Sequence, residues 1–248
     1  MIERVRYYAG LFNFGDDINP LLCTLITGRA VKEMHVLDET PEDHILMCGS
    51  ILYYANEHSI VWGAGFIDSR SPIMGEPKGI WAVRGPLTAK RLEQLGIEVD
   101  VPYGDPVLLL KRLYKPVPLS QDYEYGVIAH YIDRKTVEDW PDNILRIDIA
   151  SAPWKIVQDV NRCKKIISSS LHGIVIADTY NIPALWVKLS DGLVGDDFKF
   201  HDYFASIGRK DVDFVDLRGG YSHGVLNAFV DYKVDIDLDR LYEACPLI

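Results

Sequence analysis

Short, uninterrupted apolar runs alternate along this chain with longer segments of helical period. Runs such as residues 45–48 show no polar alternation, which is typical of strands that are covered on both faces. Strands that alternate with helices indicate βαβ units and parallel sheets. The alternation therefore predicts an α/β fold.

The expected elements fall into two similar sets. In the first set, strands are predicted at residues 4–9, 44–48, 59–62 and 79–83, and helices at 18–27 and 86–95. In the second set, strands are predicted at residues 125–129, 145–149, 165–168 and 184–187, and helices at 152–162, 171–180, 198–207 and 238–244. Two prolines among polar residues at 115–122 indicate a linker between the sets.

The linker divides the chain into two Rossmann-like domains, residues 1–118 and residues 119–248, the second ending in the C-terminal helix. Ligands of such sheets bind beyond the carboxyl ends of the strands. The expected site is therefore a cleft that the two domains face.

The composition limits the partners of the chain. Its 248 residues carry a net charge of −10, with an isoelectric point of about 5.1. Nucleic acids and anionic membrane surfaces attract the opposite sign, so we expect neither as a main partner. An anionic substrate would need a pocket that is basic against this overall field.

We expect the protein to be cytoplasmic. No apolar leader follows Met1, and no apolar run reaches the roughly 18–20 residues that cross a bilayer. Peripheral contact with membrane machinery is compatible with this expectation. The four cysteines lack zinc-ligand spacing, so we expect buried free thiols and no metal: Cys23, Cys48, Cys163 and Cys245.

The first candidate site follows the first predicted strand, at residues 13–20. Gly15 permits unusual backbone angles, and Asp16 or Asp17 can cap the helix predicted from Ile18. A capped turn alone would account for this pattern. The functional alternative is that the helix N-terminus, with Asn13 and Asp16, faces an anion or a sugar.

Two further strands end in small residues. Gly49 and Ser50 form a turn whose N–H groups can approach a phosphate or carboxylate closely. Gly63 and Gly65 begin a dinucleotide fingerprint, but its third glycine position holds Asp68, so we reject NAD and FAD as cofactors.

Arg84 lies where a predicted strand ends and a helix begins. A guanidinium beside a positive helix end suits a bidentate oxyanion, while the structural alternative is a pair with a surface carboxylate. Asp105 follows in a Gly-Asp-Pro turn. It could orient a neighbouring arginine or a sugar hydroxyl, or serve only the turn.

The second domain offers two histidines and a lysine. His130 ends a predicted strand at the mouth of the expected cleft. His172 lies in the first turn of an apolar helix that the serines before it, including Ser170, can cap. Desolvation and the positive helix end favour a neutral imidazole suited to proton transfer, although a core histidine is the alternative. Lys199 or His201 could also reach the cleft.

Taken in order, these motifs resemble the polysaccharide pyruvyl transferases, and most closely the ketal-forming, succinoglycan-type branch of exopolysaccharide synthesis. The resemblance covers about residues 5–207 and rests on six motifs: Asn13-Phe14-Gly15-Asp16, Gly49-Ser50-Ile51-Leu52, Val61-Trp62-Gly63-Ala64-Gly65, Arg84-Gly85-Pro86-Leu87-Thr88, Gly104-Asp105-Pro106 and Ser170-Leu171-His172-Gly173. It implies a GT-B-like pair of domains, phosphoenolpyruvate as the donor and no further cofactor.

The resemblance also implies roles for particular residues. Arg84 matches a donor-binding arginine, and His172 matches the histidine of the catalytic site. Many relatives carry arginine where this chain has Ser170, so that donor contact is absent or comes from elsewhere, with Lys199 and Arg209 as candidates.

The implied reaction moves pyruvyl onto two hydroxyls of a saccharide in an exopolysaccharide or its precursor, lipid-linked or not, and releases phosphate. We expect Arg84 and the turn at Gly49 and Ser50 to hold the anion. His172 is the first candidate for proton transfer and His130 the second.

Two other functions stay open. A GT-B-type glycosyltransferase would need a nucleotide pocket with a carboxylate for the ribose, for which Glu124, Asp148 and Asp178 are candidates. A non-catalytic sugar-binding descendant of such an enzyme would also account for Ser170.

Overall fold

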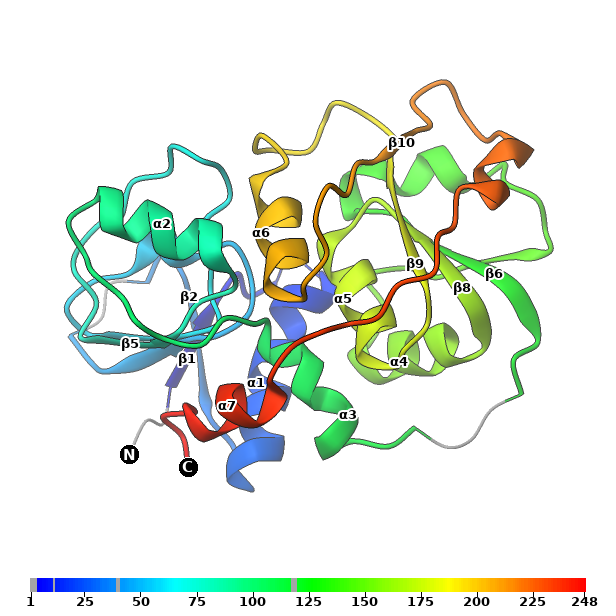
Figure 1. The fold of residues 1–248 in the computed structure, drawn as a ribbon. Helices are drawn as coiled ribbons and strands as arrows, with labels where there is room; N and C mark the ends of the chain where they lie inside the picture. The colour runs from blue at the N-terminus through cyan, green and yellow to red at the C-terminus, as the bar shows by residue number, and fades with distance from the viewer. Residues whose placement is uncertain (1–3, 11, 39–40, 117–119) are drawn as a thin grey trace.

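Two five-stranded sheets, each formed by parallel strands, divide the chain into two halves (Figure 1). The computed structural model describes residues 4–10, 12–38, 41–116 and 120–248. The domain boundary predicted at residue 118 lies outside these residues. The predicted α/β class is confirmed.

The first sheet has the strand order β2-β1-β3-β4-β5. Its strands are β1 (Arg4–Tyr7), β2 (Lys32–His35), β3 (His44–Leu46), β4 (Ser59–Trp62) and β5 (Gly79–Ala82). The helices of this half are α1 (Phe14–Thr27), α2 (Pro86–Gln94) and α3 (Leu110–Leu113), with the 3-10 helices η1 (Leu52–Tyr54) and η2 (Pro106–Leu109).

The second sheet has the order β10-β9-β8-β6-β7. Its strands are β6 (Tyr123–Ile128), β7 (Ile144–Arg146), β8 (Cys163–Ser168), β9 (Ala184–Lys188) and β10 (Val215–Asp216). The helices are α4 (Pro153–Asn161), α5 (Leu171–Thr179), α6 (Phe198–Ser206) and α7 (Leu238–Glu243), with the 3-10 helices η3 (Tyr131–Val137) and η4 (His223–Asn227).

Counted within its own half, each sheet has the order 2-1-3-4-5, which is the flavodoxin-like order of doubly wound sheets. The connections reverse direction between β1 and β3 in the first sheet and between β6 and β8 in the second. Each reversal opens a crevice at the carboxyl ends of these strands. The two halves therefore share a topology, although their sequences show no repeat.

Most predicted elements are present, with differences that have local causes. The strands β2 and β10 were not predicted, because both are short and largely exposed and so lack an apolar run. Helix α1 begins at Phe14 and not at Ile18, so Asp16 and Asp17 lie in its first turn and do not cap it.

Helix α1 tolerates a proline in its interior. Pro20 has no N–H for the carbonyl of Asp16, four residues earlier. The side-chain amide of Asn19 donates to that carbonyl at 3.0 Å and to the carbonyl of Gly15 at 2.9 Å. The buried Asn19 thus supplies the hydrogen bond that the proline removes and keeps the first turns helical.

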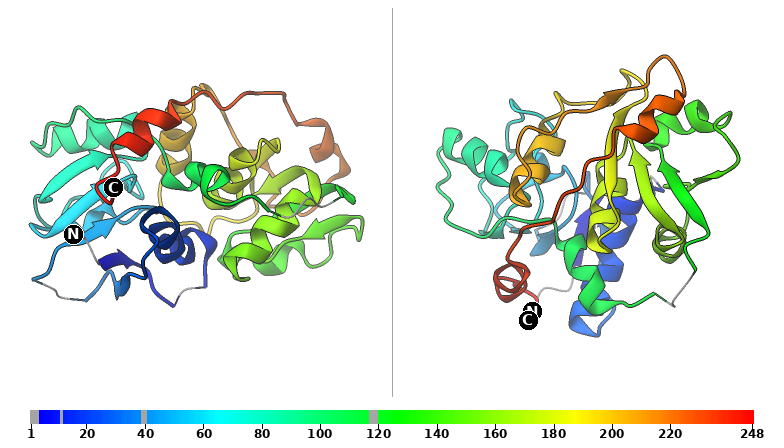
Figure 2. Two further views of the ribbon diagram at one scale, coloured as in Figure 1. Left: turned by 90° about the horizontal axis from the view of Figure 1, so that it is seen from below. Right: turned by 45° about the vertical axis from the view of Figure 1, so that its right-hand side comes forward.

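The two halves share a core and exchange elements. One apolar cluster runs from Val5 and Ile18 in the first half to Ile128 and Ile174 in the second. Figures 1 and 2 show the segment after β10 crossing back to the first half, where α7 packs. The indole N–H of Trp62 donates to the carbonyl of Leu241 in α7 at 3.0 Å.

Two expectations from composition can be compared with the structure. All four cysteines are buried and free, as predicted. In the described parts of the chain, no helix combines the length and apolar character that crossing a bilayer requires.

A buried ion pair also joins the halves. The carboxylate of Asp202 in α6 accepts hydrogen bonds from Nε of Arg84 at 3.0 Å and from the Thr88 hydroxyl at 2.6 Å. Its other oxygen accepts the backbone N–H groups of Leu87 and Thr88, at 2.9 Å each. Both charged side chains are fully buried. A residue of the second half therefore caps α2 of the first.

Replacing Asp202 with Ala should lower the free energy of unfolding by about 3–5 kcal/mol, because Arg84 would keep a buried charge without its partner. Urea unfolding of both proteins measures this loss. Asp239→Ala is the matched control, since it breaks the exposed pair with Arg112 and should cost less than about 1 kcal/mol. Equal losses in the two variants would contradict a dominant role for the buried pair.

Candidate active site

A cavity of about 670 Å³ lies between the two halves. Its walls come from the segments that follow β1, β3 and β4 in the first half and β6, β8 and β9 in the second, so the cavity includes the crevices of both sheets. Eight residues predicted from the sequence line it: Asn13, Asp16, Gly49, Ser50, His130, Ser170, His172 and Lys199. Three others, Gly65, Arg84 and Asp105, lie behind the wall and do not line it.

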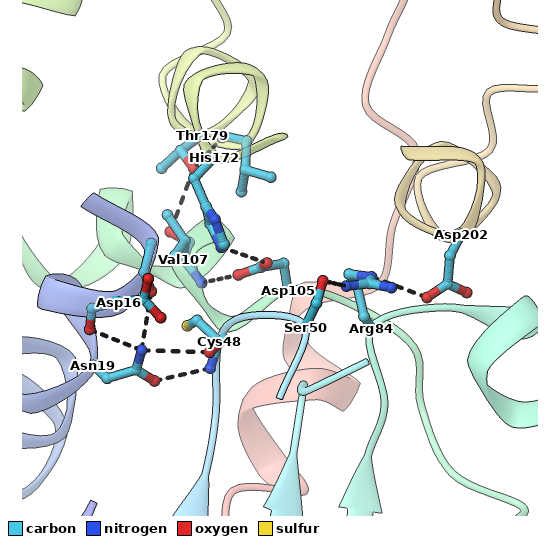
Figure 3. A network of polar contacts seen from close by, with 12 residues as sticks. Asp16, Asn19, Cys48, Ser50, Arg84, Asp105, Val107, His172, Thr179 and Asp202 are labelled. Carbon is cyan, nitrogen blue, oxygen red and sulfur yellow. Dashed lines mark hydrogen bonds and ion pairs between the residues drawn. The ribbon is translucent and has the colours of Figure 1, made fainter. Parts of the chain in front are cut away.

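His172 reaches the cavity because a glycine stands opposite it. A Cβ atom on Gly15 would lie 2.0 Å from Nδ1 of the imidazole, so another residue there would displace the ring. Asn19 holds this part of α1 against the end of β3, since its Oδ1 accepts the N–H of Cys48 at 2.9 Å. Figure 3 shows Asn19 between Asp16 and Cys48.

Behind His172 lies Asp105. Oδ2 of Asp105 is 3.4 Å from Nε2 of His172, and the carboxylate is fully buried (Figure 3). Its Oδ1 accepts the N–H of Val107 at 3.0 Å, at the start of η2. The turn contact that the sequence offered as one role of Asp105 is present, while the structure places His172, and not the predicted arginine or sugar hydroxyl, beside its other oxygen.

Arg84 acts on the cavity through another side chain. Its Nη1 donates to Oγ of Ser50 at 2.9 Å, and its Nη2 donates to the carbonyl of Phe66 at 2.6 Å. A Cβ atom on Gly65 would lie 2.5 Å from the guanidinium carbon, so Gly65 makes room for the arginine. Because Oγ of Ser50 already accepts from Arg84, the Ser50 hydroxyl is left to donate into the cavity.

Basic and acidic groups meet in the cavity. Burial, followed by the charge of Arg84, lowers the pKa of Lys199 to about 8. Burial raises the pKa of Asp16 to about 6, against hydrogen bonding from Asn13 and the charge of His172. Arg70 lines the cavity from an exposed position. No cluster of three metal-ligating side chains was found among the described residues, and the prediction that the reaction uses no metal stays a prediction.

His130 is held at the end of β6 by its backbone. Its N–H donates to Oγ of Ser169 at 2.9 Å, and that hydroxyl donates to the buried Asp133 at 3.0 Å. Burial, then the charges of Lys199 and His172, lowers the pKa of the imidazole to about 4. His130 therefore stays neutral near pH 7 and is suited to hydrogen bonding.

Tyrosines form a part of the wall that the sequence did not reveal. Tyr8 follows β1, Tyr53 and Tyr54 lie in η1, and Tyr131 begins η3. The hydroxyls of Tyr8 and Tyr54 are hydrogen-bonded to each other, and the rings of Tyr53 and Tyr54 meet edge to face. Each of these tyrosines lies close in sequence to a predicted site residue. That closeness is the sequence signal from which the tyrosines could have been predicted.

Ser170, Arg209 and His201 do not make the contacts that the sequence predicted for them. Ser170 stands at the N-cap of α5 without a side-chain capping bond, and Oγ of Ser168 accepts its N–H at 3.0 Å. Arg209 is stacked on the ring of Tyr232 in a different pocket, so it does not supply the contact expected in place of Ser170. His201 is exposed on α6.

The carboxylates considered for a nucleotide ribose also lie elsewhere. Glu124 pairs with Lys164 at 2.8 Å, and Asp148 lies 3.7 Å from Arg134. Asp178 is buried and accepts from the hydroxyl of Tyr203 at 2.9 Å. The cavity wall contains none of the three.

Asp16→Asn should make stability less dependent on pH. Because the pKa of Asp16 is raised to about 6 in the folded chain, folding takes up a proton, and this group stabilises the fold less as pH rises through about 4–6. Between pH 4 and pH 7.5, the free energy of unfolding of the variant should therefore rise by about 2–3 kcal/mol relative to that of the wild type. Denaturant unfolding at both pH values measures the gain, with circular dichroism as the control for native structure. If the two proteins differed in free energy of unfolding by the same amount at both pH values, the raised pKa of Asp16 would be contradicted.

Comparison with known proteins places this arrangement in a family. The sequence pattern of the family described as polysaccharide pyruvyl transferase matches residues 6–191. That span contains all the cavity-lining residues except Val194 and Lys199.

Two relatives match at lower identity. The chain is 31% identical over 217 residues to the uncharacterized protein L143 of Acanthamoeba polyphaga mimivirus, covering 82% of this chain and 74% of the relative. It is 26% identical over 207 residues to the succinoglycan biosynthesis protein ExoV of Rhizobium meliloti (strain 1021), covering 79% of this chain and 62% of the relative. With its fold, its cavity and a match over most of its length, the chain belongs to the polysaccharide pyruvyl transferase family.

Proposed function

We propose that the protein transfers the pyruvyl group of phosphoenolpyruvate to two hydroxyls of one sugar, forming a cyclic pyruvate ketal and releasing phosphate. The observation that carries the proposal is the convergence of Lys199, His172 and Ser50 on one cavity at the facing crevices of the two sheets. Its volume of about 670 Å³ lies within the usual range of ligand sites and leaves room for a small donor beside a sugar ring.

The donor is a small, strongly anionic molecule, and the cavity offers groups that suit it. Lys199 is mostly protonated at pH 7 with its pKa of about 8, and a bound anion would raise that pKa further. The Ser50 hydroxyl, polarised by Arg84, can donate to a carboxylate or phosphate oxygen. Arg70 adds a second cation. Lys199 and Arg70 are therefore our assignment for the contact that relatives obtain from arginine at position 170.

The proposed chemistry balances without an external oxidant or reductant. A proton adds to the methylene carbon of the donor, one sugar hydroxyl attacks C2, and its proton leaves to a base. The bond between C2 and the bridging oxygen then breaks, and the second hydroxyl closes the ring as its proton passes to the departing phosphate. Because both ketal oxygens come from the sugar, phosphate must leave with the bridging oxygen.

The side chains divide these proton transfers. His172, at the cavity wall, is the base that accepts a hydroxyl proton. Asp16 has a pKa of about 6, so it can hold and release a proton near neutral pH and is suited to supply the methylene carbon. His130, with a pKa of about 4, stays the second candidate and otherwise orients the substrates as a neutral hydrogen-bonding group.

The acceptor that we propose is a saccharide of an exopolysaccharide or its precursor. Four tyrosines line the cavity, and their amphipathic rings suit the binding of sugar rings: Tyr8, Tyr53, Tyr54 and Tyr131. The name of the Rhizobium relative, a succinoglycan biosynthesis protein, supports an acceptor of this class. A GT-B-like placement of the two halves around the substrates belongs to the same proposal.

A donor test separates pyruvyl transfer from glycosyl transfer. Phosphoenolpyruvate should raise the Tm of the protein and nucleotide-sugars should not, because binding to the folded state alone stabilises it. With an acceptor saccharide, phosphoenolpyruvate labelled with ¹⁸O at the bridging position should release labelled phosphate, detected by mass spectrometry. Stabilisation by nucleotide-sugars alone, or release of unlabelled phosphate, would overturn the proposal.

His172→Ala should reduce acceptor-dependent phosphate release by about 100-fold or more, because the hydroxyl loses its base. His223→Ala is the matched control, since that histidine is exposed on η4 away from the cavity, and its rate should stay near the wild-type rate. A nearly normal rate for His172→Ala would remove His172 from the mechanism.

A further inference from the structure

We propose that Asp105 is a positioning residue that fixes the tautomer of His172. It holds the hydrogen of the neutral imidazole on Nε2 and so leaves Nδ1 as the nitrogen that accepts a proton in the cavity. The catalytic consequence of this inference rests on the proposed function, whereas the tautomer itself does not.

The first observation is the isolation of the two facing atoms. Nε2 of His172 and Oδ2 of Asp105 are both buried and lie 3.4 Å apart, and neither atom has a well-aligned hydrogen bond within the described residues. The thiol of Cys48 also contacts the carboxylate of Asp105 as a hydrogen-bond donor. A buried carboxylate oxygen without a strong donor is costly, and a thiol donates only weakly, so a hydrogen on Nε2 directed at Oδ2 is the arrangement that satisfies both atoms.

The second observation is the fixed direction of the carboxylate. Its Oδ1 accepts the N–H of Val107, which leaves Oδ2 directed at the imidazole. The carbonyl of the same Val107 accepts a hydrogen bond from Thr179 at the far end of α5, the helix that carries His172 (Figure 3). Asp105 and His172 are thus tied to each other through η2 and α5.

Cys48 also faces this carboxylate, but it adds no charge. Burial first, and Asp105 second, raises the pKa of the Cys48 thiol well above its usual value, so the thiol stays protonated. The negative charge of Asp105 therefore acts mainly on the imidazole.

The remaining nitrogen, Nδ1, faces the first turn of α1, beside the cavity that His172 lines. Nδ1 is the ring atom closest to the position of a Cβ on Gly15, beside the first turn of α1 where Asp16 lines the cavity. When a sugar hydroxyl attacks, its O–H bond breaks and an N–H bond forms at Nδ1. The resulting positive charge on the ring is offset by the carboxylate of Asp105.

Asp105→Asn tests this inference. A carboxamide keeps the shape of the side chain and an oxygen for the N–H of Val107, but it presents N–H to Nε2 and so favours hydrogen on Nδ1. The kcat should fall about 10²–10⁴-fold while the KM for phosphoenolpyruvate changes less than about threefold. Long-range ¹H–¹⁵N spectra of His172 should show the hydrogen on Nε2 in the wild type and on Nδ1 in the variant.

Asp178→Asn is the matched control. It replaces another buried carboxylate, on the same helix as His172 but bonded to Tyr203, and should change neither the kcat nor the tautomer. Hydrogen on Nδ1 in the wild type, or a folded Asp105→Asn variant with a kcat near the wild-type value, would overturn the inference. If Asp105→Asn does not fold, the wild-type tautomer alone decides. If the spectra show the tautomer change but the wild type transfers no pyruvyl group, the inference about Asp105 stands and the proposed function is wrong.

Discussion

The buried carboxylate of Asp202 determines how the two halves meet. It neutralises Arg84 and accepts two backbone N–H groups of α2 and the Thr88 hydroxyl, so one side chain from the second half satisfies four donors of the first. Helix α6, which carries Asp202, also carries Lys199 three residues earlier, at the cavity wall. The ion pair therefore fixes the position of the lysine and, through Arg84, the direction of the Ser50 hydroxyl.

Given that interface, the shared strand order explains why the polar groups gather in one place. In each half the crevice lies between the first and third strands, and the two crevices face each other. The first half contributes the N-terminus of α1, the Gly49–Ser50 turn and tyrosines, while the second contributes both imidazoles and Lys199. The groups assigned to the anion come from both halves, Ser50 and Arg70 from the first and Lys199 from the second, so the proposed chemistry depends on their contact.

The sequence was informative where function follows local pattern. β4 has the predicted bounds, and His172 lies in the first turn of an apolar helix as expected. Local pattern could not find the partner of Arg84, which is 118 residues away on another helix. For the same reason, Asp105 was predicted to contact a ligand although it faces His172. The start of α1 was missed because Asp16 and Asp17 are typical capping residues, which placed the start at Ile18. The amide of Asn19, which compensates for Pro20 in the longer helix, is visible only in three dimensions.

Asp16 and Lys199, two of the cavity groups with shifted pKa values, owe these shifts first to burial. Removal from water moves the pKa of Asp16 up to about 6 and that of Lys199 down to about 8, so the acid and the cation both titrate near neutrality. An arriving anion stabilises the protonated form of each, because it repels the carboxylate and attracts the ammonium group. Donor binding would thus favour the protonated forms of Asp16 and Lys199 before a proton has to move to carbon. These local shifts give the site its protons although the chain as a whole carries a net negative charge.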